Sequence, residues 1–277
     1  MNQSWILKTN MNENKKSIGI FDSGLGGLTV LKELKLQLPN ESFIYFGDIK
    51  NLPYGNKSNK SILNYSHKIS DFLVSKNIKG LVIACNTASA IAYKKIDKLF
   101  QIPVYNVIDP CVEKAIQTTE TNHIAVIGTE ATINAGTYQK KINKIDKKVN
   151  IISRPCPLFV PIVEENLIKE KFTYDIVKYY LKTIKNSDID TLILGCTHYP
   201  FINNLIGRFL ENKIKIISSS IVTAQHIKKQ LSKRLLLNQA KSHSEDSFYV
   251  SDEPQKFNYL AQTFLNNKKI KVKKIVL

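Results

Sequence analysis

Short runs of apolar residues alternate with longer amphipathic stretches along most of the chain. The apolar runs are rich in β-branched side chains, and they predict strands at 17–21, 43–46, 80–84, 104–108, 124–128, 149–152, 191–195 and 214–217. Between these runs the apolar positions recur at helical spacing, which predicts helices over 28–38, 62–75, 88–100 and 174–184 and one that begins near residue 134. Apolar strands that alternate with helices are typical of parallel sheets in an α/β architecture.

The alternation restarts near Ile124, and two segments on either side of that point share one design. Leu81–Thr87 and Leu192–His198 each contain an apolar strand, a small residue, a cysteine and two polar residues. We therefore expect two similar α/β halves, each with a cysteine, Cys85 or Cys196, at the carboxyl end of a strand. Ligands of open α/β sheets bind at such strand ends, so two facing halves would place the cysteines on opposite walls of one cleft.

The composition is that of a globular protein with room for one large domain or two ordinary ones. The chain has 277 residues, of which 43% are hydrophobic and 23% charged, and no apolar run approaches the roughly 20 residues that span a bilayer. Residues 1–16 are polar apart from Trp5–Leu7, and we expect a flexible tail there rather than a signal peptide. The four cysteines lack paired spacing, which favours reduced thiols and a cytoplasmic location.

The formal net charge of +17 raises the alternative of a nucleic-acid-binding protein. Base readers and bidentate phosphate clamps depend on arginine, however, and this chain has only Arg154, Arg208 and Arg234. The lysines are spread over the whole chain rather than gathered in one stripe. We expect no specific nucleic-acid partner, and nucleic-acid binding stays the alternative from outside the enzyme classes.

Cysteine is most often a small buried hydrophobe, and we interpret Cys111 and Cys156 in that way. Cys85 and Cys196 differ because polar residues follow each of them at a strand-to-loop junction, where free backbone N–H groups favour a thiolate. Structural zinc would need a second close ligand pair besides Cys196 and His198, so we expect no metal. A cysteine–histidine hydrolase would use that pair but would leave Cys85 unexplained.

A glycine-rich turn at 21–28 follows the first predicted strand. It is not a dinucleotide fingerprint, because Thr29 stands where the third glycine would fall, and it lacks the lysine of a phosphate-binding loop. A glycine-rich turn that opens a helix still binds anions, and here we expect the anion to be a carboxylate. Pro53–Gly55 follows the second strand, where an open α/β site is built.

Several of these segments together closely resemble the signatures of bacterial glutamate racemases, members of the aspartate/glutamate racemase family. The strongest are FDSGLGGLTVL (21–31), FGDIKNLPYG (46–55), ACNTASA (84–90) and GCTHYPF (195–201). Weaker ones are GTEAT (128–132) with Tyr138, CPLFVPIVEE (156–165) and FYVSDEPQKF (248–257). The resemblance runs in order from about Ser17 to the end of the chain.

The resemblance implies two α/β domains that face a central cleft, with a C-terminal segment that returns to the first domain. We expect a first domain of 17–109 plus 220–277 and a second of 110–219. It also implies L- and D-glutamate as substrates, no cofactor, a role in peptidoglycan synthesis and Cys85 and Cys196 as the proton-transferring thiols. The residues implied to hold the substrate or tune the thiols are Asp22, Ser23, Tyr54, Gly55, Asn86, Thr87, Thr197 and His198.

Some questions stay open at this point. A related racemase that acts on aspartate or a hydantoin is the alternative within the enzyme class, and the oligomeric state is undecided, with a homodimer as one option. One position also departs from the family, which has an Asp-Ser pair where this chain has Ser218 and Ser219 after the last strand of the second half. We expect that position to be the counterpart of the Asp22–Ser23 turn.

Overall fold

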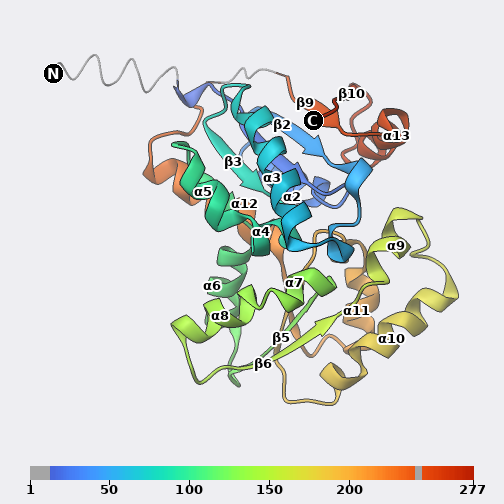
Figure 1. Cartoon of the computed structure of the whole chain (residues 1–277). Helices are drawn as coiled ribbons and strands as arrows, with labels where there is room; N and C mark the ends of the chain where they lie inside the picture. Colours follow the sequence, from blue (N-terminus) through green and yellow to red (C-terminus); the bar gives the residue numbers. More distant parts are fainter. Residues whose placement is uncertain (1–12, 241–244) are drawn as a thin grey trace.

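The computed structural model describes residues 13–240 and 245–277, and these form two α/β units, each built on an all-parallel sheet (Figure 1). This confirms the predicted fold class of two similar parallel-sheet units with a C-terminal segment that returns to the first. Most of the expected N-terminal tail, 1–12, lies outside the described residues. Its last part is attached to the fold, because Lys79 Nζ donates a hydrogen bond of 2.6 Å to the carbonyl oxygen of Asn14.

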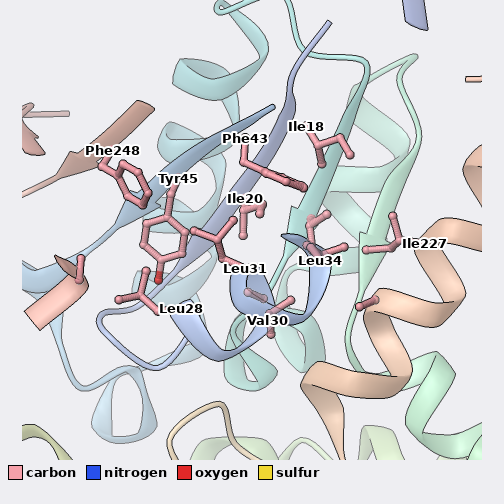
Figure 2. Packing of buried hydrophobic residues seen from close by; sticks show 14 of the residues in the cluster. Ile18, Ile20, Leu28, Val30, Leu31, Leu34, Phe43, Tyr45, Ile227 and Phe248 are labelled. Atoms are coloured by element: carbon pink, nitrogen blue, oxygen red, sulfur yellow. The ribbon is translucent and has the colours of Figure 1, made fainter. Parts of the chain in front are cut away.

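The first sheet has six strands in the order β10-β9-β2-β1-β3-β4. Their bounds are β1 (Ile18–Asp22), β2 (Phe43–Gly47), β3 (Gly80–Ile83), β4 (Val104–Asn106), β9 (Ser247–Val250) and β10 (Val272–Lys274). Helices α2 (Leu28–Gln37), α12 (Ser219–Lys233) and α13 (Pro254–Phe264) cover one face, and α3 (Asn59–Val74), α4 (Asn86–Ile91) and α5 (Tyr93–Leu99) cover the other. Figure 2 shows Leu31 and Leu34 of α2 packed with strand residues Ile20 and Phe43 and with Ile227 of α12.

The second sheet has four strands in the order β6-β5-β7-β8. Their bounds are β5 (His123–Gly128), β6 (Asn150–Pro155), β7 (Thr191–Gly195) and β8 (Lys215–Ser218). Helices α6 (Ile108–Thr118) and α8 (Thr137–Ile145) pack on one face, and α9 (Phe159–Glu164), α10 (Lys171–Lys185) and α11 (Asn203–Phe209) pack on the other. The short helix α7 (Glu130–Asn134) follows β5 and contacts α4 of the first unit.

The chain passes between the two units twice, from β4 into α6 and from β8 into α12, and these two helices contact each other. Because α6 packs on the second sheet and α12 on the first, we propose the domain division expected from the sequence, 17–109 plus 220–277 and 110–219. The two sheets share a topology. In each, the next two strands in the sequence flank the first, so the strand order reverses at β1 and at β5. Ligands of doubly wound sheets bind at such points.

Three expected elements differ in the structure. The strand predicted over 104–108 ends at Asn106, because the Asn106 Oδ1 atom accepts from the backbone N–H groups of Ile108 and Asp109 and so caps helix α6. The helix predicted over 88–100 is interrupted at Ala92 between α4 and α5. The helix near residue 134 is divided by Gly136, whose φ of 64° is left-handed.

The structure also corrects the expectation for Ser218. This residue ends β8, which is the outer neighbour of β7 and therefore corresponds to β4 rather than to β1. The counterpart of the Asp22–Ser23 turn is instead the segment after β5, which begins at Thr129. The Ser218 Oγ atom lies 2.8 Å from the Ser220 Oγ atom.

Candidate active site

A small cavity with about 280 Å³ of empty space lies between the carboxyl ends of the two sheets. It is lined from the first unit by the loop after β1, by 3-10 turn η2 (Tyr54–Asn56) and by the start of α4, and from the second by the segments after β5 and β7. Of the ten residues expected in the site, nine line this cavity: Ser23, Tyr54, Gly55, Cys85, Asn86, Thr87, Cys196, Thr197 and His198. The tenth, Asp22, lies behind the wall.

Cys85 follows β3 and is the N-cap residue of α4, so its side chain lies at the edge of the first sheet. Its thiol donates a hydrogen bond of 3.7 Å to Ser23 Oγ. Burial and, after it, the charge of Asp22 raise the pKa of the Cys85 thiol to about 12, although the hydrogen bonds with Ala88 N–H and Ser23 act in the opposite direction. These surroundings favour the neutral thiol at Cys85.

Asp22 occupies the anion-binding position of the glycine-rich turn. Gly24 N–H donates to Asp22 Oδ1 at 2.9 Å, and a second backbone hydrogen bond comes from Gly27. Burial raises the pKa of Asp22, whereas the nearby charge of His198 and these hydrogen bonds lower it. The amides that the sequence predicts for a bound carboxylate are therefore used by the protein's own carboxylate, and Thr197 Oγ1 adds a hydrogen bond of 3.2 Å to Asp22 Oδ2.

Cys196 has a different neighbour. It follows β7, and its sulfur lies 3.8 Å from Nδ1 of His198, which precedes the 3-10 turn η3 (Tyr199–Ile202). The other ring nitrogen, Nε2, lies 2.5 Å from Oε1 of Glu164 at the end of α9. Burial lowers the pKa of His198, but the hydrogen bonds to Cys196 and Glu164 outweigh burial and raise the pKa well above its ordinary value. The raised pKa favours the imidazolium form of His198, whose ring lies beside the Cys196 sulfur.

Close contacts between the two units hold the walls together. A Cβ atom on Gly26 would lie 2.4 Å from Thr197 Oγ1 and 2.5 Å from His198 Nδ1, so only glycine lets the turn approach this closely. Thr29 Oγ1 donates to the carbonyl oxygen of Thr197 at 3.2 Å. On the other side of the cavity, three threonine hydroxyls from both units lie within 3.0 Å of one another: Thr87, Thr129 and Thr132.

Two further wall residues are fixed by partners behind them. Tyr54 OH donates to Asp48 Oδ2 at 2.6 Å, which holds the turn after β2 against the cavity. Tyr138 OH, from α8, donates to Asn86 Oδ1 at 2.7 Å, and the Nδ2 atom of Asn86 is buried without a partner in the described part of the chain. The Asn86 amide thus retains a free donor at the cavity.

The sequence did not assign roles to several of these residues. Glu164, Asp48, Thr129 and Thr132 act through contacts that the fold creates between distant segments. The only signal for Glu164 and the two threonines is that they fall within 156–165 and 128–132, segments that resemble the family without a chemical pattern of their own.

Residues 13–240 and 245–277 contain no cluster of three or more His, Cys, Asp or Glu side chains that could hold a metal ion. None of the helices formed by these residues is both long and apolar enough to cross a bilayer.

Comparison with known proteins identifies the family. Residues 30–227 match the model of the Asp/Glu/hydantoin racemases. A glutamate racemase from Geobacter metallireducens is 42% identical over 253 residues, which cover 91% of this chain and 94% of the relative.

Solved structures agree. A glutamate racemase isoform from Bacillus anthracis aligns with a TM-score of 0.90 at 35% identity, over 95% of this chain and 98% of that chain. One from Francisella tularensis, solved in complex with D-glutamate, aligns with a TM-score of 0.88 at 38% identity over the same shares. The cavity between two parallel-sheet units, the paired strand-end cysteines and these similarities lead to one conclusion: the chain belongs to the Asp/Glu/hydantoin racemase family and, within it, to the glutamate racemases.

Proposed function

We propose that the protein interconverts L- and D-glutamate by two-base proton transfer, with Cys85 and Cys196 as the two bases. The observation that carries this proposal is the placement of both thiols on opposite units around one closed cavity, each at the carboxyl end of an equivalent strand. Inversion at Cα requires that a proton leave one face and another arrive at the opposite face, so two groups on facing walls suit the reaction.

The chemistry is demanding because the α-hydrogen of glutamate is very weakly acidic. The adjacent carboxylate resists further negative charge, and the proposed reaction uses no pyridoxal group as an electron sink. The carbanion-like transition state must therefore be stabilised by pre-organised donors in a cavity that excludes water. Both cysteines are buried, with exposed fractions of 4% for Cys85 and 5% for Cys196, which fits a site of this kind.

The two thiols must begin each turnover in opposite protonation states. His198 lies beside Cys196, while burial and Asp22 disfavour a charge on Cys85. We infer that Cys85 begins as the thiol, and that Cys196, with His198 beside it, acts as the partner base. In one direction Cys196 removes the α-proton and Cys85 donates its own to the other face; in the reverse direction the roles exchange.

The polar groups of the wall suit a dianionic amino acid. The Nδ2 donor of Asn86 has no partner in the described part of the chain, and Ser23 Oγ, which accepts from Cys85, keeps its own hydrogen to donate to a carboxylate. Thr87 and Thr197 line the cavity beside them, and we assign these polar groups to the carboxylates and ammonium group of the substrate. Tyr54 and Gly55 narrow the cavity from the first unit. Asp22 does not line the cavity, so we assign it to tuning Cys85 and holding Thr197 rather than to direct substrate binding.

We further propose that the protein works in the cytoplasm and supplies D-glutamate for peptidoglycan. This role rests on the family alone. Depletion of the protein in its host should cause a wall defect that external D-glutamate relieves. Unchanged wall synthesis in a host with no second source of D-glutamate would contradict the role without touching the chemistry.

The activity is tested by incubating purified protein with L-glutamate in heavy water, with a chelator and without added cofactor, and then separating the enantiomers. We expect D-glutamate to form with deuterium at Cα. Activity that requires pyridoxal phosphate or a metal would overturn the proposal. Parallel reactions with L-aspartate separate it from the aspartate alternative, since we expect conversion of glutamate to be much the faster.

A further inference from the structure

Asn86 is held by a contact that crosses between the two units. It begins α4 beside Cys85, it is buried, and it lines the cavity. The hydrogen bond to its Oδ1 comes from Tyr138 on α8 of the second unit. A primary amide has an acceptor end and a donor end of nearly the same shape, so the partner on Oδ1 decides which end faces the cavity.

Tyr138 is itself buried in the core of the second unit, so its hydroxyl is held against Asn86. The hydroxyl donates to Asn86 Oδ1, which leaves the Nδ2 group at the other end of the amide without a partner in the described part of the chain.

We propose that Tyr138 is a positioning residue that orients the Asn86 amide so that its NH2 group faces a substrate carboxylate. This inference rests on the proposed function for the identity of that carboxylate. The opposite orientation would turn a carbonyl oxygen toward a dianion. Because α8 and α4 belong to different units, the orientation is fixed only while the units are together, which couples closure of the cavity to the formation of its carboxylate site.

The first test is Tyr138→Phe, which keeps the ring in the core and removes only the hydroxyl. We expect the KM for both enantiomers of glutamate to rise about tenfold, which is the scale of one hydrogen bond to a charged group, while kcat changes less than about threefold. Tyr105→Phe is the matched control, because the Tyr105 hydroxyl is also buried but has no partner in the described part of the chain. It should leave KM unchanged.

A double-mutant cycle separates positioning from general support of the fold. Asn86→Ala alone should raise KM at least as much as Tyr138→Phe, and adding Tyr138→Phe to it should change KM less than twofold. If the two substitutions instead multiply their separate effects on KM, Tyr138 does not act through Asn86 and the inference is overturned.

Asn86→Asp decides the matter even where Tyr138→Phe does not fold, because it keeps an acceptor for Tyr138 and removes the NH2 donor. It should raise KM at least about tenfold, and an unchanged KM would overturn the inference. Wild-type protein serves as the reference in calorimetry with D-glutamate: failure of the wild type to bind or racemise glutamate overturns the proposed function itself, whereas an active wild type with an unaffected Tyr138→Phe overturns this inference alone.

Discussion

Cys85 and Cys196 follow equivalent strands, β3 and β7, yet their surroundings are opposite in charge. Cys85 has a serine hydroxyl and a helix amide nearby, and Asp22 lies behind it. Cys196 has an imidazolium within 3.8 Å, supported by a carboxylate on the far side of the ring. The shared topology thus places two sulfurs symmetrically, and the residues beyond each strand make them chemically unequal.

In the proposed reaction, this difference would let one site hold an acid and a base of the same residue type. Two thiols in identical surroundings would compete for the same protonation state, whereas charges of opposite sign separate them. The Asp22 carboxylate of the first unit also accepts a hydrogen bond from Thr197 of the second, so a direct contact joins the two walls. If the account is right, changes on the two walls should have related but distinguishable effects.

Removal of either sulfur should have the largest effect. Cys85→Ala and Cys196→Ala should each lower the rate of racemisation by at least about 10³-fold in both directions, because each removes half of an acid–base pair. Cys156→Ala is the control, since Cys156 is buried in the core of the second unit and outside the cavity lining. A Cys85→Ala variant with wild-type turnover would contradict the two-base scheme and favour an enzyme with a single nucleophile.

Loss of the cation on the Cys196 wall should come next. His198→Asn should lower kcat/KM about a hundredfold, because the variant lacks the imidazole that lies beside the Cys196 sulfur. The exposed histidine of α3 provides the comparison, and His67→Asn should have no effect. A loss confined to KM would instead assign His198 to substrate binding.

A smaller effect is expected from the carboxylate behind the imidazole. Glu164→Gln should lower kcat/KM about tenfold, the scale of one charge-assisted hydrogen bond. It should also move the alkaline limb of the pH–rate profile to lower pH, because Glu164 helps to raise the pKa of His198. Glu165→Gln is the matched control, because Glu165 is the next residue and is exposed. Equal effects of the two substitutions would contradict a specific role for Glu164 beside His198.

His198 and Cys85 should also contribute to the free energy of unfolding over different pH ranges. The pKa of His198 is raised above 6.5 in the folded state, so its contribution to the free energy of unfolding is full below pH 6.5 and is lost as pH rises toward the folded value. The pKa of Cys85 is raised from 9.0 to about 12, so its contribution is lost only between these values. Denaturant titrations of His198→Asn and Cys85→Ser against wild type should therefore diverge in different pH ranges.

Much of this scaffold could be predicted from local pattern. Apolar runs predicted strands β1 to β8, and the repeated small-residue–cysteine junction indicated both thiols and their common cleft. Strands β9 and β10 were not predicted, because SFYV and VKK are too short to stand out as apolar runs. Helix α6 was not predicted, and its first residue, Ile108, was included in the preceding strand, since the capping action of Asn106 is not visible in hydropathy.

The chemical contrast between the walls could not be predicted in the same way. His198 was recognised beside Cys196 because the two are close in sequence, but Glu164 reaches the imidazole from α9, 34 residues away. Similarly, the glycine-rich turn was expected to bind an external carboxylate, and the fold shows that Asp22 takes its amides. Such partners arise from tertiary contacts that periodicity does not encode.

The central claim is that each sulfur serves one face of Cα, and deuterium exchange in single-cysteine variants tests it most directly. L- and D-glutamate are incubated separately with Cys85→Ser and with Cys196→Ser in heavy water, and deuterium at Cα is followed by NMR. The account predicts that each variant exchanges only one enantiomer and that the two variants choose opposite enantiomers. Exchange of the same enantiomer by both variants would contradict it.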